Sequence, residues 1–207
     1  MMHRFGLLRR GALLGVLGCL AAVGLAIPTT AAAKVTSLTH CQLQILSPGQ
    51  YRLDANIATE HACFVLDASG ITLDLNGHTI TNRSVDEHVG IMAFKAGDKI
   101  VGPGTIAGFR YGISLVNNNE RVHGVTAIAN GIGIGVNSHG NIVRDNVTTN
   151  NALAGIDVFP SETGNTIKRN FAHSNGTYDD LRDNTPNCGN NVWTDNDFGT
   201  ANQSCIH

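Results

Sequence analysis

Charged and aromatic residues are scarce in this sequence, at 14% and 5% of its 207 positions. Runs of the helix formers Glu, Lys, Leu and Gln are almost absent from its repeated part, which argues against helical and leucine-rich repeats. Gly, Asn, Thr, Val and Ile are abundant instead, and they are typical of short strands joined by tight turns. With so few rings, we expect a narrow core of stacked aliphatic side chains.

Motifs for metal binding and nucleophilic catalysis are lacking as well. No cysteine pair has the Cys-x-x-Cys spacing, and no two histidines stand at i and i+2, where a strand would aim both at one ion. Neither Ser69-Gly70 nor Ser138-His139-Gly140 forms a nucleophile elbow. We therefore expect no metal and no cofactor.

The first 33 residues have the pattern of a signal peptide. Arg4, Arg9 and Arg10 precede a long uncharged apolar run that closes with Ala31-Ala32-Ala33. An uncleaved anchor and a lipoprotein site at Cys19 are the alternatives, and the paired arginines leave the twin-arginine route open. We predict cleavage after residue 33 and export to the periplasm, the cell surface or the medium.

The remaining 174 residues carry 11 basic and 16 acidic side chains, a formal net charge of −5. Such a chain has no overall electrostatic attraction to nucleic acid. Once residues 1–33 are removed, we expect no association with a membrane. The length fits a single domain, residues 34–207, which we expect to be a monomer.

The dipeptide Gly-Ile recurs at a nearly constant interval in this domain. It occurs at Gly90-Ile91, Gly112-Ile113, Gly133-Ile134 and Gly155-Ile156, in steps of 22, 21 and 22 residues, and Asp180-Leu181 takes its place once more. Units of this size cannot bury an apolar face alone, so they must stack into a solenoid. Three short strands per unit predict an all-β parallel β-helix of about six coils. A compact antiparallel sandwich is the alternative.

Both ends of the domain depart from the repeat. We expect residues 34–62 to form an N-terminal β cap, residues 63–187 the coils, and residues 188–207 the last coil and a C-terminal cap. Two cysteine pairs lie at these ends, Cys41 with Cys63 and Cys188 with Cys205. Of three possible connectivities, this local pairing suits a solenoid, whose ends never meet. Each disulfide would stabilise the fold by about 3 kcal/mol.

Further columns of residues accompany the Gly-Ile repeat. The inward residues of a second strand are predicted at Leu73, Val101, Val122, Val143, Ile167 and Trp193. Asparagine follows three residues later at Asn146, Asn170 and Asn196, and a second asparagine series comprises Asn130, Asn150 and Asn175. Because asparagine tolerates left-handed turns and its amide can bond to the next coil, we expect both series to form ladders.

These motifs resemble the right-handed parallel β-helix proteins with pectate-lyase-like repeats, specifically small secreted bacterial ones. The resemblance covers nearly all of residues 34–207 and includes Leu73-Asp74-Leu75-Asn76-Gly77-His78-Thr79-Ile80 and Asn190-Asn191-Val192-Trp193. The larger family includes lyases and epimerases that act on uronates at the exposed face of the first sheet. There a cation or an arginine neutralises the carboxylate and a base removes the C5 proton. The epimerase motif Asp-Pro-His is absent from this sequence.

Alternation along the Gly-Ile strands places an outward column beside the buried one. Its members are Met92, Ser114, Gly135, Asp157 and Arg182. Asp157 and Arg182 are candidate catalytic residues, and an ordinary ion pair between coils is the alternative. Two residues further along, Phe94 and Phe159 face outward. Either ring is available to stack on a sugar, Phe159 being the candidate binding residue, and the alternative is that loops cover both rings.

On the second strand, one outward column is basic. It is predicted to contain Asp74, Gly102, His123, Arg144, Lys168 and Thr194. His123, Arg144 and Lys168 come from successive coils about 5 Å apart, where like charges repel one another. They are candidate contacts for an anionic polymer, and a solvated surface is the alternative.

Two functions remain open at this point. The first is a non-catalytic module, secreted or at the cell surface, that binds an acidic polysaccharide or a cell-wall glycan. The second is a small lyase or epimerase that acts on uronate polymers through Asp157 and Arg182. Because the outward face offers few side chains suited to catalysis, we favour the non-catalytic module.

Overall fold

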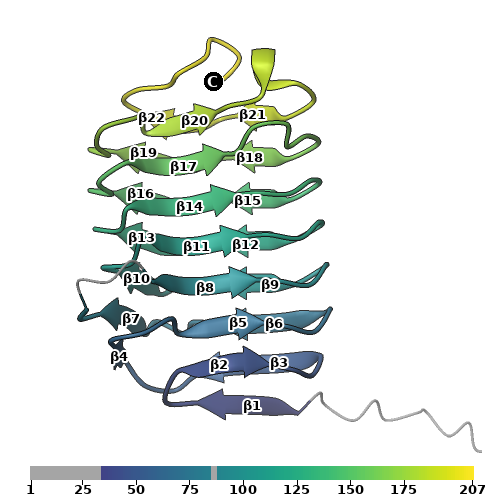
Figure 1. The fold of residues 1–207 in the computed structure, drawn as a ribbon, viewed down its shortest axis with the longest axis vertical. Coiled ribbons are helices and arrows are strands. Elements are labelled where there is room, and N and C mark those ends of the chain that lie inside the picture. The colour runs from purple at the N-terminus through teal and green to yellow at the C-terminus, as the bar shows by residue number, and fades with distance from the viewer. Residues whose placement is uncertain (1–33, 85–87) are drawn as a thin grey trace, which may run out of the picture. The chain divides into compact units, whose positions relative to one another are not determined.

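The computed structural model describes residues 34–84 and 88–207, which form a parallel β-solenoid (Figure 1). The predicted signal peptide, residues 1–33, lies outside the described residues. The coils stack their strands into three parallel sheets, here named A, B and C, which the chain visits in the order B, A, C. The all-β solenoid predicted from the repeat is therefore confirmed.

Sheet B contains the Gly-Ile strands, sheet A follows it in each coil, and sheet C completes the coil. Sheet B has seven strands: β2 (Gln42–Ile45), β5 (Phe64–Leu66), β8 (Val89–Ala93), β11 (Tyr111–Leu115), β14 (Ile132–Val136), β17 (Ala154–Val158) and β20 (Leu181–Asp183). Sheet A has eight: β1 (Val35–Leu38), β3 (Gly49–Leu53), β6 (Ile71–Asp74), β9 (Lys99–Val101), β12 (Arg121–His123), β15 (Ile142–Arg144), β18 (Thr166–Lys168) and β21 (Val192–Thr194). Sheet C has seven: β4 (Ile57–Thr59), β7 (Thr79–Asn82), β10 (Thr105–Ala107), β13 (Thr126–Ile128), β16 (Val147–Thr149), β19 (Phe171–His173) and β22 (Asp197–Phe198).

The strands make about seven coils, whereas the repeat predicted about six. The difference comes from residues 34–62, which lack the Gly-Ile signature. Their strands nevertheless join all three sheets: β1 and β3 enter sheet A, β2 enters sheet B, and β4 enters sheet C. The predicted cap region therefore continues the stack.

The core is a pile of aliphatic side chains enclosed by the three sheets. One column in sheet B consists of Ile91, Ile113, Ile134, Ile156 and Leu181, all fully buried. The column in sheet A consists of Leu73, Ile100, Val122, Val143, Ile167 and Trp193. These columns confirm the period of the repeat and the direction in which its apolar residues point.

One inward residue was predicted wrongly. Ile100 fills the core position assigned to Val101, and Val101 points outward in register with His123. Val101 therefore also replaces Gly102 in the predicted outward column. Two aliphatic residues stand side by side in Lys99-Ile100-Val101, so alternation alone could not decide which of them faces the core.

Glycine is the second residue of β8, β11, β14 and β17 in sheet B because adjacent coils approach closely there. A Cβ atom at Gly112 would lie 2.7 Å from the carbonyl oxygen of Gly133, and one at Gly133 would lie 2.6 Å from that of Gly155. A larger residue would therefore push the coils apart. In the last repeat, Asp180 takes the place of glycine. Its carboxylate accepts the backbone N–H of Thr200 at 2.9 Å, which ties the C-terminal segment to the stack.

Three asparagine ladders run up the corners of the solenoid. Their members are Asn146, Asn170 and Asn196; Asn130, Asn151 and Asn175; and Asn141, Asn165 and Asn191. In each ladder, the backbone N–H and the side-chain NH2 of one asparagine donate to Oδ1 of the next, at 2.8–3.1 Å. The first ladder confirms a prediction. The second contains Asn151 where Asn150 was predicted, because Asn150 itself adopts the left-handed turn, with φ of 55°. The third was not predicted.

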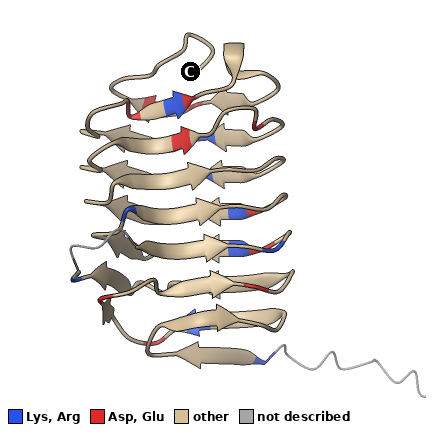
Figure 2. Cartoon of the chain, viewed as in Figure 1, with Lys and Arg blue, Asp and Glu red and all other residues tan. Residues whose placement is uncertain are grey.

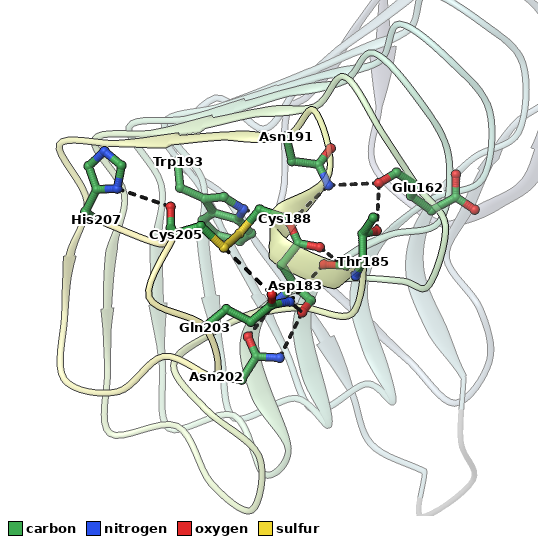
Figure 3. Close-up of a disulfide and its surroundings, with 10 residues drawn as sticks. All are labelled: Glu162, Asp183, Thr185, Cys188, Asn191, Trp193, Asn202, Gln203, Cys205 and His207. Carbon is green, nitrogen blue, oxygen red and sulfur yellow. Dashed lines mark hydrogen bonds between the residues drawn. A yellow bond between two sulfur atoms is a disulfide. The ribbon is translucent and has the colours of Figure 1, made fainter.

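Both predicted disulfides are present, with Cα–Cα distances of 4.5 Å for Cys41–Cys63 and 6.1 Å for Cys188–Cys205. The second links the short 3₁₀ turn η1 (Pro186–Cys188) to the C-terminal segment. Asp183 lies near this disulfide in Figure 3 and is fully buried. It accepts hydrogen bonds from Trp193 Nε1 at 2.9 Å and from Asn191 Nδ2 at 3.0 Å. This polar network and the disulfide close the C-terminal end of the core.

Candidate functional site

The outer face of sheet B carries a hollow of about 330 Å³. It lies beside β11, β14, β17 and β20 and is bordered by the loop after β17 and by the loop between β19 and β20. In Figure 2, a red segment on β17 lies below a blue segment on β20 at this face. The charged and aromatic side chains that line the hollow are Arg110, Tyr111, Asp157, Phe159, Tyr178 and Arg182.

Asp157 is the buried carboxyl group of the hollow. It lies on β17 in register with Arg182 of β20, and only 3% of its surface is exposed. Its Oδ1 accepts a hydrogen bond from Asn184 Nδ2 at 2.7 Å. Burial raises the pKa of Asp157 to about 6, against the opposing effects of the Arg182 charge and the Asn184 hydrogen bond. A carboxyl group in this range can change its protonation state close to neutral pH.

Arg182 stands at the rim of the hollow. Within the described residues, it makes no salt bridge of 4.0 Å or less with Asp157, although the two residues are neighbours in register. Its guanidinium lies over the ring of Tyr178 instead, 4.2 Å from the ring centroid. Stacking on an aromatic ring orients an arginine while leaving its in-plane N–H donors at the edge of the stack.

Tyr111 and Phe159 form another wall, with ring centroids 6.3 Å apart. Gly135 lies between them on β14, where a Cβ atom would come within 3.1 Å of the Tyr111 ring and 3.5 Å of the Phe159 ring. The missing side chain in the middle of the outward column therefore makes room for both rings. The Arg110 guanidinium lies 5.7 Å from the Tyr111 ring centroid and places a second cation at the hollow.

The outward alternation located Asp157, Phe159 and Arg182 on this face but missed the other three charged or aromatic lining residues, Arg110, Tyr111 and Tyr178. Tyr111 is the first residue of β11, and Arg110 directly precedes that strand. Gly112 and Ile113 are both buried there, so strict alternation does not apply. Tyr178 comes from a loop that no strand pattern describes, and its backbone N–H bonds to the carbonyl of Leu153 at 2.9 Å. No signal in the sequence indicated that this loop borders the hollow.

Phe94 lies outside the hollow. The residue is 44% exposed, and the ammonium group of Lys95 lies 4.9 Å from the centroid of its ring. The expectation that Phe94 faces outward is therefore confirmed, while Phe159 is only half-buried and lines the hollow.

The predicted basic column is present on sheet A, where His123, Arg144 and Lys168 lie in register on β12, β15 and β18. Asp145, which sequence reasoning did not include, lies beside it. Its carboxylate binds Arg169 Nε at 2.8 Å and Arg144 Nη1 at 2.6 Å. The Arg169 hydrogen bond is the main reason that the pKa of Asp145 is lower than usual, with burial acting in the opposite direction. The column is therefore partly neutralised.

A buried acidic pair continues the third asparagine ladder. The backbone N–H of Glu120 donates to Asn141 Oδ1 at 2.8 Å, and Glu120 Oε2 accepts the backbone N–H of Asp98 at 2.8 Å. Both acidic residues are 1% exposed. Burial raises the pKa of Glu120 to about 9, with the charge of Asp98 adding to the effect, and burial raises the pKa of Asp98 to about 6. The ladder position of these groups indicates a structural role.

Residues 34–84 and 88–207 contain no group of three or more His, Cys, Asp or Glu side chains that could hold a metal ion. Across these same ranges, every helix is too short or too polar to cross a membrane. A scan against protein-family models, a search of curated proteins and a search of solved structures each found no match. Inferences about function therefore depend on the side chains themselves.

Proposed function

We propose that this protein is a non-catalytic module that binds an acidic glycan in the hollow of sheet B. One observation carries this proposal: three aromatic rings and two guanidinium groups surround a single hollow. Aromatic faces pack against the apolar faces of sugar rings, and a guanidinium binds a carboxylate through two parallel hydrogen bonds. A uronic acid polymer presents both features in every sugar.

The floor of the hollow adds groups that can recognise sugar hydroxyls. Asp157 can accept a hydrogen bond from a hydroxyl, and Asn184, whose Nδ2 already donates to Asp157, lines the hollow beside it. A neutral glycan could use the rings and these polar groups but would leave the guanidinium of Arg182, which forms no ion pair within 4.0 Å in the described residues, without an anion. We therefore expect acidic glycans to bind more tightly than neutral ones.

We further propose that the protein is exported and is related to the pectate-lyase-like β-helix proteins that its sequence resembles. The parallel solenoid agrees with the fold that this resemblance implies, and two disulfides suit an oxidising compartment. The protein would then meet its glycan in a cell wall or an extracellular polymer. N-terminal sequencing of protein recovered outside the cytoplasm tests export, because a chain that still carries residues 1–33 contradicts cleavage.

Calorimetric titration with oligogalacturonate, oligoalginate and a neutral oligosaccharide tests the binding function. We expect binding of the acidic oligosaccharides and roughly tenfold weaker binding in Tyr178→Ala or Phe159→Ala, which each remove a stacking ring. Phe171→Ala is the matched control, because Phe171 is an exposed ring on sheet C. Equal binding of neutral and acidic ligands, or an equal loss in the control variant, would contradict the proposal.

A second candidate function, a small lyase or epimerase acting on uronates, is favoured by the burial and raised pKa of Asp157. In a lyase, Asp157 would take the C5 proton as the bond from C4 to the glycosidic oxygen breaks, which leaves a C4–C5 double bond, and the departing oxygen would take a proton from water. In an epimerase, a proton would return to C5 from the opposite face. Arg182 would neutralise the uronate carboxylate in either reaction.

Incubation with pectate and alginate distinguishes catalysis from binding. Ultraviolet absorbance detects the new double bond, and proton nuclear magnetic resonance detects inverted C5 centres. Product formation that disappears in Asp157→Asn would establish catalysis. Binding without product from either polymer would leave the non-catalytic function as the one supported.

A further inference from the structure

Sheet A carries a second depression, separate from the hollow of sheet B. It has a volume of about 270 Å³ and is formed by β9, β12 and β15 of three successive coils. We call it the sheet A groove. The outward side chains that line it are Lys99, Val101, Arg121, His123, Ile142 and Arg144.

The strand register brings two cations of the groove together. Lys99 lies opposite Arg121, so their backbone positions are about 5 Å apart on adjacent coils. His123 follows Arg121 by two residues and therefore projects from the same face of β12. Figure 2 shows blue segments on neighbouring coils at β9 and β12. The groove thus presents a concentrated positive charge.

Asp145 neutralises part of one side of the groove. It binds the lining residue Arg144 at 2.6 Å, lies 3.7 Å from Nδ1 of His123, and receives two hydrogen bonds from Arg169, at 2.8 and 3.0 Å. In contrast, neither Lys99 nor Arg121 forms an ion pair within 4.0 Å in the described part of the chain. Two like charges placed opposite each other on paired strands are mildly destabilising, so the fold gains nothing from this pair alone.

We propose that the sheet A groove binds sulfate or phosphate ester groups of a linear polymer, with Lys99 and Arg121 as the main contacts. A tetrahedral ester anion presents several acceptor oxygens in different directions. This geometry suits a lysine, an arginine and a histidine that converge from adjacent strands. A planar carboxylate is matched by one guanidinium fork and would leave the second cation without a partner. The apolar side chains of Val101 and Ile142 can contact the carbon atoms of the polymer.

Dextran derivatives separate the possible ligand chemistries on one neutral backbone. Immobilised dextran sulfate, phosphorylated dextran, carboxymethyl dextran and unmodified dextran are tested at several salt concentrations against the full chain carrying Tyr178→Ala, so that carboxylate binding in the hollow of sheet B does not mask the result. We expect binding to one or both ester polymers, weaker binding at higher salt, and little binding to the carboxylated or unmodified polymer. Comparison of the binding to dextran sulfate with the binding to phosphorylated dextran shows which ester the groove prefers. Equally tight binding to carboxymethyl dextran, or no binding to either ester polymer, would overturn the proposal.

A pair of charge-matched variants tests the location. Lys99→Gln with Arg121→Gln should weaken ester binding at least tenfold, because each substitution removes a charge-assisted hydrogen bond. The control, Lys34→Gln with Arg83→Gln, removes the same number of positive charges outside the groove. Equal losses in the two double variants would show attraction to overall charge and would overturn the assignment. Tyr178→Ala should retain ester binding, since a loss there would place the ester in the hollow of sheet B.

Discussion

Replacing Glu120 by glutamine should stabilise the fold at neutral pH. In the corner ladder above Glu120, each asparagine accepts through Oδ1 and donates through its NH2 group to the next coil. Glu120 accepts through Oε2 in the same way, but its other oxygen, Oε1, has no hydrogen-bond partner in the described residues. A protonated carboxyl can donate as the asparagine NH2 groups do, whereas a carboxylate cannot. Glutamine supplies a permanent donor of nearly the same size.

The size of the effect follows from the pKa of Glu120 in the two states. The ordinary value of 4.5 applies to the unfolded chain, and burial raises the folded value to about 9. At pH 7 the folded state therefore retains a proton that the unfolded state has lost. Retaining it costs about 1.4 kcal/mol for each pH unit above the unfolded value, or roughly 3 kcal/mol at pH 7. The stability that the protonated Glu120 gives the fold is therefore fully present below about pH 4.5 and is lost as the pH rises towards 9.

Urea unfolding at several pH values can measure this difference. Trp193, the single tryptophan, is almost fully buried, so its fluorescence should report unfolding of the last coil together with the core. Glu120→Gln should match the natural protein at acidic pH and become progressively more stable from about pH 5 to pH 8. Glu60→Gln, which removes an exposed carboxyl, is the control and should show no such trend. A constant difference over this range, or a less stable Glu120→Gln protein at neutral pH, would refute a protonated Glu120.

Three other substitutions test the packing of the coils. Gly133→Ala should lower the free energy of unfolding by roughly 1–3 kcal/mol, because the new Cβ atom would meet the Gly155 carbonyl at 2.6 Å; an unchanged urea midpoint would show that the coils can separate there. Asp183→Ala should cost roughly 2 kcal/mol by leaving the Trp193 indole N–H without its acceptor, and unaltered stability and fluorescence would argue against this role. Cys188→Ser should lower stability by about 3 kcal/mol, which thermal unfolding with and without reductant can check, since reduction breaks two disulfides in the natural protein but only Cys41–Cys63 in the variant and should therefore destabilise the variant less.

The inward residues of the fold could be predicted because every coil must satisfy the same packing. Gly112-Ile113 and its equivalents recur because the glycine permits close approach and the isoleucine fills the core. The predicted position was wrong by one residue where two adjacent residues were equally suited to it. Ile100 and Val101 are both aliphatic, and Asn150 and Asn151 are both asparagines at a corner. Only the register between coils distinguishes the members of these pairs.

The candidate sites could be predicted only in part, because outward residues are not subject to a common packing requirement. Strand alternation placed Asp157 and Arg182 in one column but could not show that Arg182 stacks on Tyr178, which belongs to a loop. It also predicted the basic column on sheet A but gave no indication that Asp145 neutralises part of it. Loop conformations and side-chain rotamers determine these contacts, and neither follows the period of the repeat.

The hollow of sheet B shows that outward positions can vary from coil to coil although the core positions of the repeat are tightly constrained. Its Tyr111 and Phe159 rings have room because of Gly135, an outward position where the preceding coil has Ser114 and the next has Asp157. Changes at such a position do not alter the core, because Ile134 and Val136 remain buried on either side. Tyr178 is supplied by a corner loop, which can lengthen without changing the register of the strands. A small outward residue and the loops at the corners therefore convert part of a regular sheet face into a hollow lined by rings and charges.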